Sequence, residues 1–153
     1  MEILNKVLFV VGQLGKGGLE RQLFYLIDQL QDKGVKVKCV VWNYNDNDPY
    51  VKPYRSILNA NLTGFSSKQS SLTKIRHLRK LNSDDKQQLI ISFTGFTNVV
   101  AYATAFSSKS VAIGSLRNSV TYHLRNGYIK ALINLILPQR ILVNSIQAIK
   151  ECE

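Results

Sequence analysis

Residues 6–30 read KVLFVVGQLGKGGLERQLFYLIDQL, and this stretch decides the fold. Val7–Val11 is a run of β-branched and aromatic side chains, which is typical of a buried strand. Gly12–Gly18 contains four glycines, and leucine and isoleucine then recur through residues 19–30 at the spacing of one helix face. A strand, a glycine loop and a helix (18–31) in this order predict half of a βαβ unit. The helix start would present free backbone N–H groups, so an anion site is one hypothesis for the loop.

Apolar runs and helical patterns alternate along the rest of the chain. Further strands are predicted at residues 35–42, 61–65, 89–93, 110–114 and 140–143, and helices at 54–58, 72–81, 98–106, 121–137 and from 146 onward. The prediction is an α/β fold over residues 1–153: one Rossmann-like domain with a doubly wound parallel sheet of about six strands and helices on both faces. Such sheets bind ligands beyond the carboxyl ends of their strands.

Charge and cysteine content narrow the class of protein. The net charge of +10 favours phosphates, nucleic acid or anionic lipid as partners, and a soluble enzyme with a basic surface is the alternative. Cys39 and Cys152 form neither a disulfide framework nor a zinc-binding spacing, and Cys39 is expected to be buried in a strand. The amino-terminal sequence lacks the layout of a signal peptide, so we expect a cytoplasmic protein.

The glycine loop does not match the usual nucleotide-binding motifs. Its glycines are not spaced as G-x-G-x-x-G, and no G-K-[ST] follows them. Trp42 and Asn43 stand where a dinucleotide site carries an acidic residue for the ribose. NAD and ATP sites of the usual kinds are therefore disfavoured. A tight turn without a ligand is an alternative, although the adjacent glycines at the helix start favour close approach of a ligand or chain segment.

Residues 15–30 resemble the opening of the family 4 retaining glycosyltransferases, which use nucleotide-sugars and have the GT-B architecture. The family's G-G-x-E motif corresponds to Gly17–Glu20, and RILVNSIQA at 140–148 resembles its sixth strand with the following asparagine–serine pair. The resemblance covers nearly the whole chain and is strongest at both ends. The histidine that relatives often carry after the fourth or fifth strand is absent, since residues 93–96 read FTGF.

The resemblance implies an acceptor-side amino-terminal domain. The donor-binding carboxyl-terminal domain, with its E-x7-E motif, would lie outside these residues, so the isolated chain is expected to be inactive. The complete enzyme would move a sugar from a nucleotide-sugar to a glycan or lipid-linked acceptor in cell-surface polysaccharide or glycolipid synthesis, without a metal or other cofactor. The alternative is a non-enzymatic Rossmann-like module for nucleotides or nucleic acid, although no recognised nucleic-acid motif is present.

Backbone N–H groups at a helix start and a nearby cation stabilise a departing diphosphate without a metal. The candidate acceptor- and diphosphate-binding residues follow four predicted strands: Gly15, Gly17, Gly18, Arg21, Thr94, Gly95, Arg117, Asn118, Asn144 and Ser145. Arg117 directly follows a strand and is the one candidate for a catalytic role. A solvated charge is the alternative for Arg21, and a helix cap is the alternative for Ser145.

Two predicted helices are candidates for docking on the anionic inner face of a membrane. Helix 121–137 mixes large apolar side chains with His123, Arg125 and Lys130, and core packing is the alternative reading of its apolar residues. Helix 72–81 is expected to pack through Leu72, Ile75, Leu78 and Leu81 and to expose Lys74, Arg76, His77, Arg79 and Lys80. The uncharged residues 87–108 are long enough to span a bilayer, but their polar and glycine content favours a strand, a turn and a buried helix.

Overall fold

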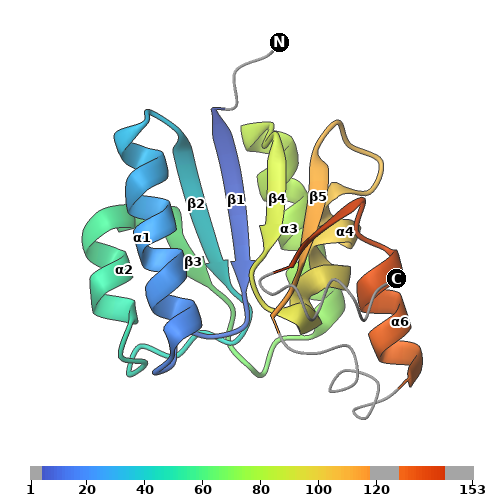
Figure 1. Cartoon of the computed structure of the whole chain (residues 1–153), viewed down its shortest axis with the longest axis horizontal. Helices are drawn as coiled ribbons and strands as arrows, with labels where there is room; N and C mark the ends of the chain where they lie inside the picture. Colours follow the sequence, from blue (N-terminus) through green and yellow to red (C-terminus); the bar gives the residue numbers. More distant parts are fainter. Residues whose placement is uncertain (1–4, 118–127, 144–153) are drawn as a thin grey trace.

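A computed structural model describes residues 5–117 and 128–143 of the chain (Figure 1). Its centre is a sheet of six strands in the order β3-β2-β1-β4-β5-β6, and every neighbouring pair is parallel. The strands are β1 (Lys6–Val11), β2 (Lys36–Val41), β3 (Leu62–Gly64), β4 (Leu89–Ser92), β5 (Val111–Leu116) and β6 (Arg140–Val143). The strand order reverses between β1 and β4, which confirms the predicted doubly wound, Rossmann-like sheet.

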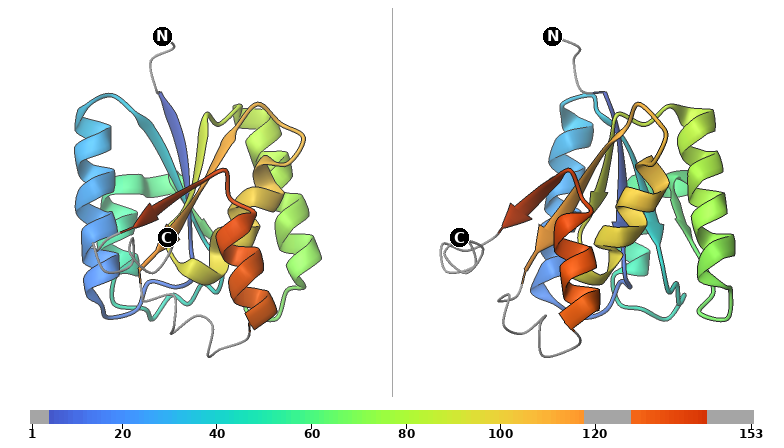
Figure 2. Two further views of the ribbon diagram at one scale, coloured as in Figure 1. Left: turned by 45° about the vertical axis from the view of Figure 1, so that its right-hand side comes forward. Right: turned by 90° about the vertical axis from the view of Figure 1, so that its right-hand side faces the viewer.

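Helices cover both faces of this sheet (Figures 1 and 2). They are α1 (Gly18–Asp32), α2 (Val51–Leu58), α3 (Ser71–Asp85), α4 (Asn98–Ala105) and α6 (Tyr128–Ile136), with 3-10 turns η1 (Asn59–Asn61) and η2 (Gly95–Thr97). The first two helices lie on one face, and α3 and α4 lie on the other. α6 packs against α4 beside β5. Residues 87–108 thus form the end of a loop, β4, η2 and α4, as predicted.

Alternation along β1 divides the core between the two faces. Val7, Phe9 and Val11 belong to the cluster under α1 and α2, whereas Leu8 and Val10 belong to the cluster under α3 and α4. All five side chains are fully buried, because β1 is central and successive residues of a strand point to opposite faces. Burial on both faces explains why Val7–Val11 is a continuous apolar run. Because β1 is the central strand, the glycine loop that follows it lies at the carboxyl end of the middle of the sheet.

Two sequence-based expectations were wrong in detail. Lys74 is 2% exposed and Leu72 is 69% exposed, so α3 meets the sheet through Lys74, Leu78 and Asn82 rather than through Leu72. The lysine is accommodated because its apolar stem is covered while its ammonium reaches backbone and amide oxygens. β5 starts and ends later than predicted, so Ser115 and Leu116 are buried strand residues rather than loop residues.

None of the helices within residues 5–117 and 128–143 combines the length and hydrophobicity that crossing a bilayer requires.

His77, expected at a helix surface, is exposed on α3, with its ring edge-on to Phe65. The predictions at residues 118–127 and 144–153, which include His123, Asn118, Asn144 and Ser145, lie outside the described residues.

Cys39 is expected to react with iodoacetamide only when the protein unfolds. Its side chain is fully buried in β2, and burial raises the pKa of the thiol to about 12. The reactive thiolate should therefore stay scarce in the folded protein even at pH 9, where an ordinary cysteine is largely ionised. Mass spectrometry of the Cys152→Ser variant would follow Cys39 alone. Labelling in urea is the positive control, and equal labelling rates with and without urea would contradict the burial.

Candidate functional site

The strand order reverses at β1 and β4, so the carboxyl ends of these two strands are the first place to look for a ligand site. Three segments meet there: the loop 12–17 after β1, the turn η2 after β4, and Arg117 directly after β5. They lie along the lower edge of the sheet in Figure 1. We refer to these three segments together as the crevice, after the place where ligands bind in sheets of this kind.

A carboxylate of α1 itself lies at the helix start and offsets part of the positive charge there. Gly17 is the residue before the helix, and no side chain caps it there. The Glu20 carboxylate lies over it instead, with Oε2 at 2.5 Å from the position that a Cβ of residue 17 would occupy. This arrangement resembles the back-reaching acid of a capping box. A Cβ at Gly18, by contrast, would meet no heavy atom within 4 Å. An external anion therefore has open access on the Gly18 side of the helix start, and the Gly17 side already holds a carboxylate.

Arg117 crosses the crevice from β5 toward α1. Its guanidinium carbon lies 4.0 Å from the centroid of the Phe93 ring, and Nη1 donates to Gln22 Oε1 at 3.4 Å. Gln22 is one helical turn beyond Gly18, so the cation reaches the face of α1 on which the open helix start lies. Burial lowers the pKa of the half-buried Arg117, but a guanidinium remains charged at neutral pH. A fixed positive charge is thus available at the crevice.

The turn after β4 is held by hydroxyl groups. Thr97 Oγ1 lies 2.8 Å from the Thr94 carbonyl oxygen and 3.3 Å from the Val10 carbonyl oxygen, and Ser92 Oγ lies 2.8 Å from the Thr94 carbonyl oxygen. Thr94 Oγ1 and Thr97 Oγ1 are 2.9 Å apart. Thr94, a candidate ligand-binding residue, is therefore engaged within its own turn. Gly95 is half-buried beside it.

Phe96, which the sequence analysis did not select, projects from this turn. It is 51% exposed, and its ring lies over Gly12 so closely that a Cβ there would be 2.5 Å from ring atoms Cε1 and Cζ. Gly12 thus allows the two loops at the switch point to touch. An aromatic residue directly after a strand–glycine turn is the sequence signal that would have found it.

The end of β2 holds a cation where dinucleotide sites hold an acid. Lys74 Nζ donates to the Trp42 carbonyl oxygen at 2.7 Å and to Asn43 Oδ1 at 3.3 Å, and lies 4.8 Å from the Trp42 ring centroid. Burial lowers the pKa of Lys74. The sequence analysis placed this lysine on a solvated face. Its actual position strengthens the argument against a ribose bound through a carboxylate.

The remaining candidates are placed as follows. Gly15 is half-buried. A Cβ at this position would lie 3.6 Å from Gln13 Nε2 and 4.0 Å from Glu20 Oε1, which are ordinary contact distances. Arg21 is exposed on the first turn of α1. Within the described part of the chain, no group of three or more His, Cys, Asp or Glu side chains is arranged to hold a metal ion.

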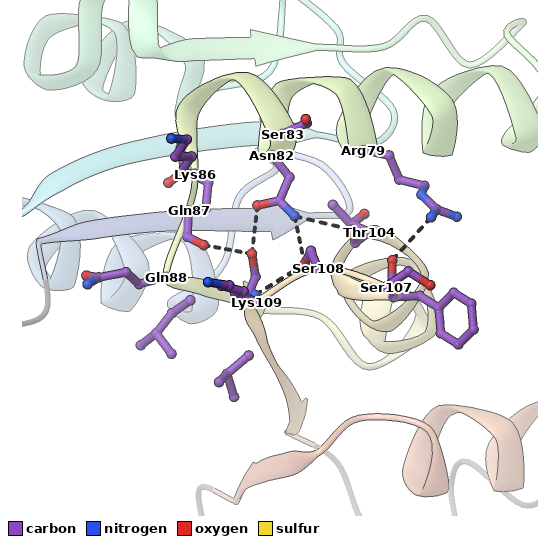
Figure 3. A pocket seen from close by; sticks show the side chains of 14 residues that line it. Arg79, Asn82, Ser83, Lys86, Gln87, Gln88, Thr104, Ser107, Ser108 and Lys109 are labelled. Carbon is purple, nitrogen blue, oxygen red and sulfur yellow. Dashed lines mark hydrogen bonds between the residues drawn. The ribbon is translucent and has the colours of Figure 1, made fainter. Parts of the chain in front are cut away.

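A pocket of about 900 Å³, whose lining residues are drawn in Figure 3, lies at the opposite edge of the sheet. It is formed where α3 and α4 end. Asn82 Nδ2 donates to Ser108 Oγ at 3.2 Å and to the Thr104 carbonyl at 3.4 Å, and Arg79 Nη2 donates to the Phe106 carbonyl at 3.2 Å. These side chains satisfy carbonyl groups that helix ends leave without partners. Size alone therefore does not make this pocket the functional site.

No family model matches the chain, and no curated protein sequence matches it. A solved structure, the apo form of the lipopolysaccharide outer core galactosyltransferase WaaB, resembles it with a TM-score of 0.71 over 96% of this chain. The two sequences are 11% identical, so the likeness shows a shared fold. The chain spans 41% of the length of that structure.

Proposed function

We propose that this chain is the acceptor-side domain of a glycosyltransferase, with the donor-binding domain outside these 153 residues. The observation that carries the proposal is the position of Arg117, whose guanidinium lies over Phe93 and donates to Gln22, four residues after the open helix start at Gly18. Support comes from the fold shared with a galactosyltransferase and from the G-G-x-E sequence at Gly17–Glu20. The complete enzyme would be a retaining, family 4 transferase of GT-B architecture that builds a cell-surface polysaccharide or glycolipid from the cytoplasmic side.

In the proposed reaction, this domain positions the acceptor and supplies positive charge near the departing diphosphate. When a sugar leaves a nucleotide-sugar, negative charge grows on the departing diphosphate. The Arg117 guanidinium and the N–H groups beside Gly18 would stabilise that charge without a metal or other cofactor. The Glu20 carboxylate lies beside Gly17, so the departing diphosphate would approach on the Gly18 side. The second domain would bind the nucleotide and close the crevice, so the isolated chain should not transfer sugar.

The test is a titration of the ¹⁵N-labelled chain with UDP, UDP-galactose and methyl glycosides of galactose, glucose and mannose. Amide shifts in residues 15–21, 94–97 and 117 on adding glycosides would support an acceptor site. A transfer assay should give no product with the chain alone and product when it is joined to a donor-binding domain. Binding of UDP or single-stranded nucleic acid with no glycoside binding would favour the alternative, a non-enzymatic nucleotide or nucleic-acid module.

The proposal includes docking of α6 on an anionic bilayer, where a lipid-linked acceptor would be found. One face of α6 is apolar and exposed to solvent. The exposed fractions of its four side chains are 72% for Ile129, 42% for Leu132, 41% for Ile133 and 67% for Ile136. The helix instead meets α4 through a polar residue, because Asn134 Oδ1 accepts from Val99 N at 3.2 Å. The net charge of +10 favours an anionic lipid surface as the cover for this stripe.

Replacing Ile129 and Ile136 together with serine is expected to reduce binding to phosphatidylglycerol vesicles about tenfold, because each exposed isoleucine would otherwise insert apolar surface into the lipid. Sedimentation of the chain with vesicles measures the bound fraction. Tyr25→Ser, at a comparably exposed side chain on α1, is the matched control. Equal binding to phosphatidylglycerol and phosphatidylcholine, or no effect of the double substitution, would contradict the docking.

A further inference from the structure

We infer that Phe96 is the platform on which a sugar ring of the acceptor packs, with the face of its phenyl ring against the C–H groups of the sugar. The inference rests on the proposed function and specifies the substrate contact within the same crevice. A phenyl face carries partial negative charge and attracts the weakly positive C–H edges of an apposed group, while a sugar's hydroxyl groups stay at the rim.

The first step is that Phe96 is exposed at a place where the backbone is fixed. Its ring rests on Gly12, and η2 is tied to β1 through the contact between Thr97 Oγ1 and the Val10 carbonyl. The Thr97 N–H also donates to the Thr94 carbonyl at 2.9 Å. The turn therefore holds the aromatic ring in the crevice at little further entropic cost on binding.

The second step is that the neighbouring aromatic rings are already covered. The Phe93 ring has the Arg117 guanidinium over it, and the Trp42 ring has the Lys74 ammonium near its centroid. Phe96 is 51% exposed, and no cation–π contact is found for it in the described part of the chain. Exposure alone does not single out Phe96, but a half-exposed ring that is fixed against Gly12 at the carboxyl ends of β1 and β4 offers its surface to a ligand bound there.

The third step distinguishes a sugar from a nucleobase. Proteins hold bases by stacking and by hydrogen bonds that read the base edge. The polar side chains of the two loops that meet at Phe96 carry hydroxyl and amide groups, which suit sugar hydroxyls: Thr94, whose Oγ1 lies 3.4 Å from the position of a Cβ at Gly12, and Gln13, the residue after Gly12. The arrangement of one aromatic face with scattered donors and acceptors fits a pyranose ring. Arg117 then lies where the phosphate of an incoming donor would approach.

The experiment measures binding of methyl β-galactoside, methyl α-glucoside and methyl α-mannoside by saturation-transfer and ¹⁵N-shift NMR. Phe96→Ala should lower the affinity for the best-binding glycoside about fivefold to tenfold. Phe96→Tyr should keep that affinity within about twofold of the unaltered chain. Phe96→Leu keeps apolar bulk without an aromatic face and should resemble the alanine variant. Phe106→Ala is the matched control, because Phe106 is 54% exposed but lies at the opposite edge of the sheet.

The outcomes separate this inference from the proposed function. If no glycoside binds the unaltered chain, the proposed acceptor site fails and the platform fails with it. If a glycoside binds but Phe96→Ala and Phe96→Leu bind it equally well, the acceptor site stands and the platform is overturned. Binding of uridine that depends on Phe96, with no glycoside binding, would assign the ring to a base and also overturn the inference. Unchanged melting temperatures exclude misfolding of the variants as the cause.

Discussion

Asn98→Ala is expected to lower the free energy of unfolding by about 3 kcal/mol or more, because one buried amide serves three partners. Asn98 is 1% exposed at the start of α4. Its Nδ2 donates to the Ser115 carbonyl at 3.1 Å and to the Asn134 carbonyl at 3.0 Å, and its Oδ1 accepts from the Ser115 N–H at 2.9 Å. Alanine would leave the N–H and both carbonyls without this partner in a buried environment, which costs more than the bonds contribute when made.

Urea denaturation followed by the fluorescence of Trp42, the single tryptophan, measures the effect. Asn61→Ala, at an exposed asparagine of η1, is the control and should change stability by less than about 0.5 kcal/mol. Hydrogen exchange should also accelerate in α6 of the Asn98 variant, since the amide links that helix to α4 and β5. A loss in the Asn98 variant no larger than the control's would show that water or rearrangement replaces these bonds.

The parts of the fold that depend on local pattern were predictable from the sequence. Val7–Val11 has no polar residue, and a strand of that kind must be buried on both faces, which in turn implies helices on both sides of a parallel sheet. The glycine loop then falls at the carboxyl end of the central strand. The location of the crevice therefore follows from chain order and from the handedness of βαβ units.

The chemistry within the crevice was less predictable, because it depends on contacts between residues far apart in the sequence. Lys74 is a surface residue by its position in a basic helix, and it becomes buried only because the carbonyl of Trp42 lies within reach. Gly12 was grouped with the glycine loop that the sequence offered as an anion site, whereas its close neighbour is the ring of Phe96. Neither pairing has a local signature. In the same way, β5 continues past its predicted end because Ser115 and Leu116 pair with Leu142 and Val143 of β6.

Arg117→Ala is expected to weaken binding of UDP, used as a nucleoside diphosphate probe, by about tenfold to a hundredfold. A charge-assisted hydrogen bond to phosphate contributes about 1.5–3 kcal/mol, and each 1.4 kcal/mol is a factor of ten in affinity. The guanidinium is half-buried and held over Phe93, so it loses less side-chain entropy on binding than a free surface cation would. Isothermal titration calorimetry measures the change.

Arg21→Ala is the matched control, because Arg21 is exposed on the first turn of α1 and should change UDP affinity by less than about threefold. Arg117→Lys should restore only part of the affinity, since an ammonium cannot both stack on Phe93 and present a planar pair of donors. Burial lowers the pKa of Arg117, but a guanidinium remains charged at neutral and mildly basic pH, so the Arg117-dependent part of the affinity should stay constant between about pH 7.5 and pH 9, where the diphosphate is also fully ionised. A larger loss of UDP affinity in the Arg21 variant than in the Arg117 variant would indicate that the phosphate binds at the surface of α1. Arg117 would then not supply the positive charge on which the proposed transfer chemistry depends.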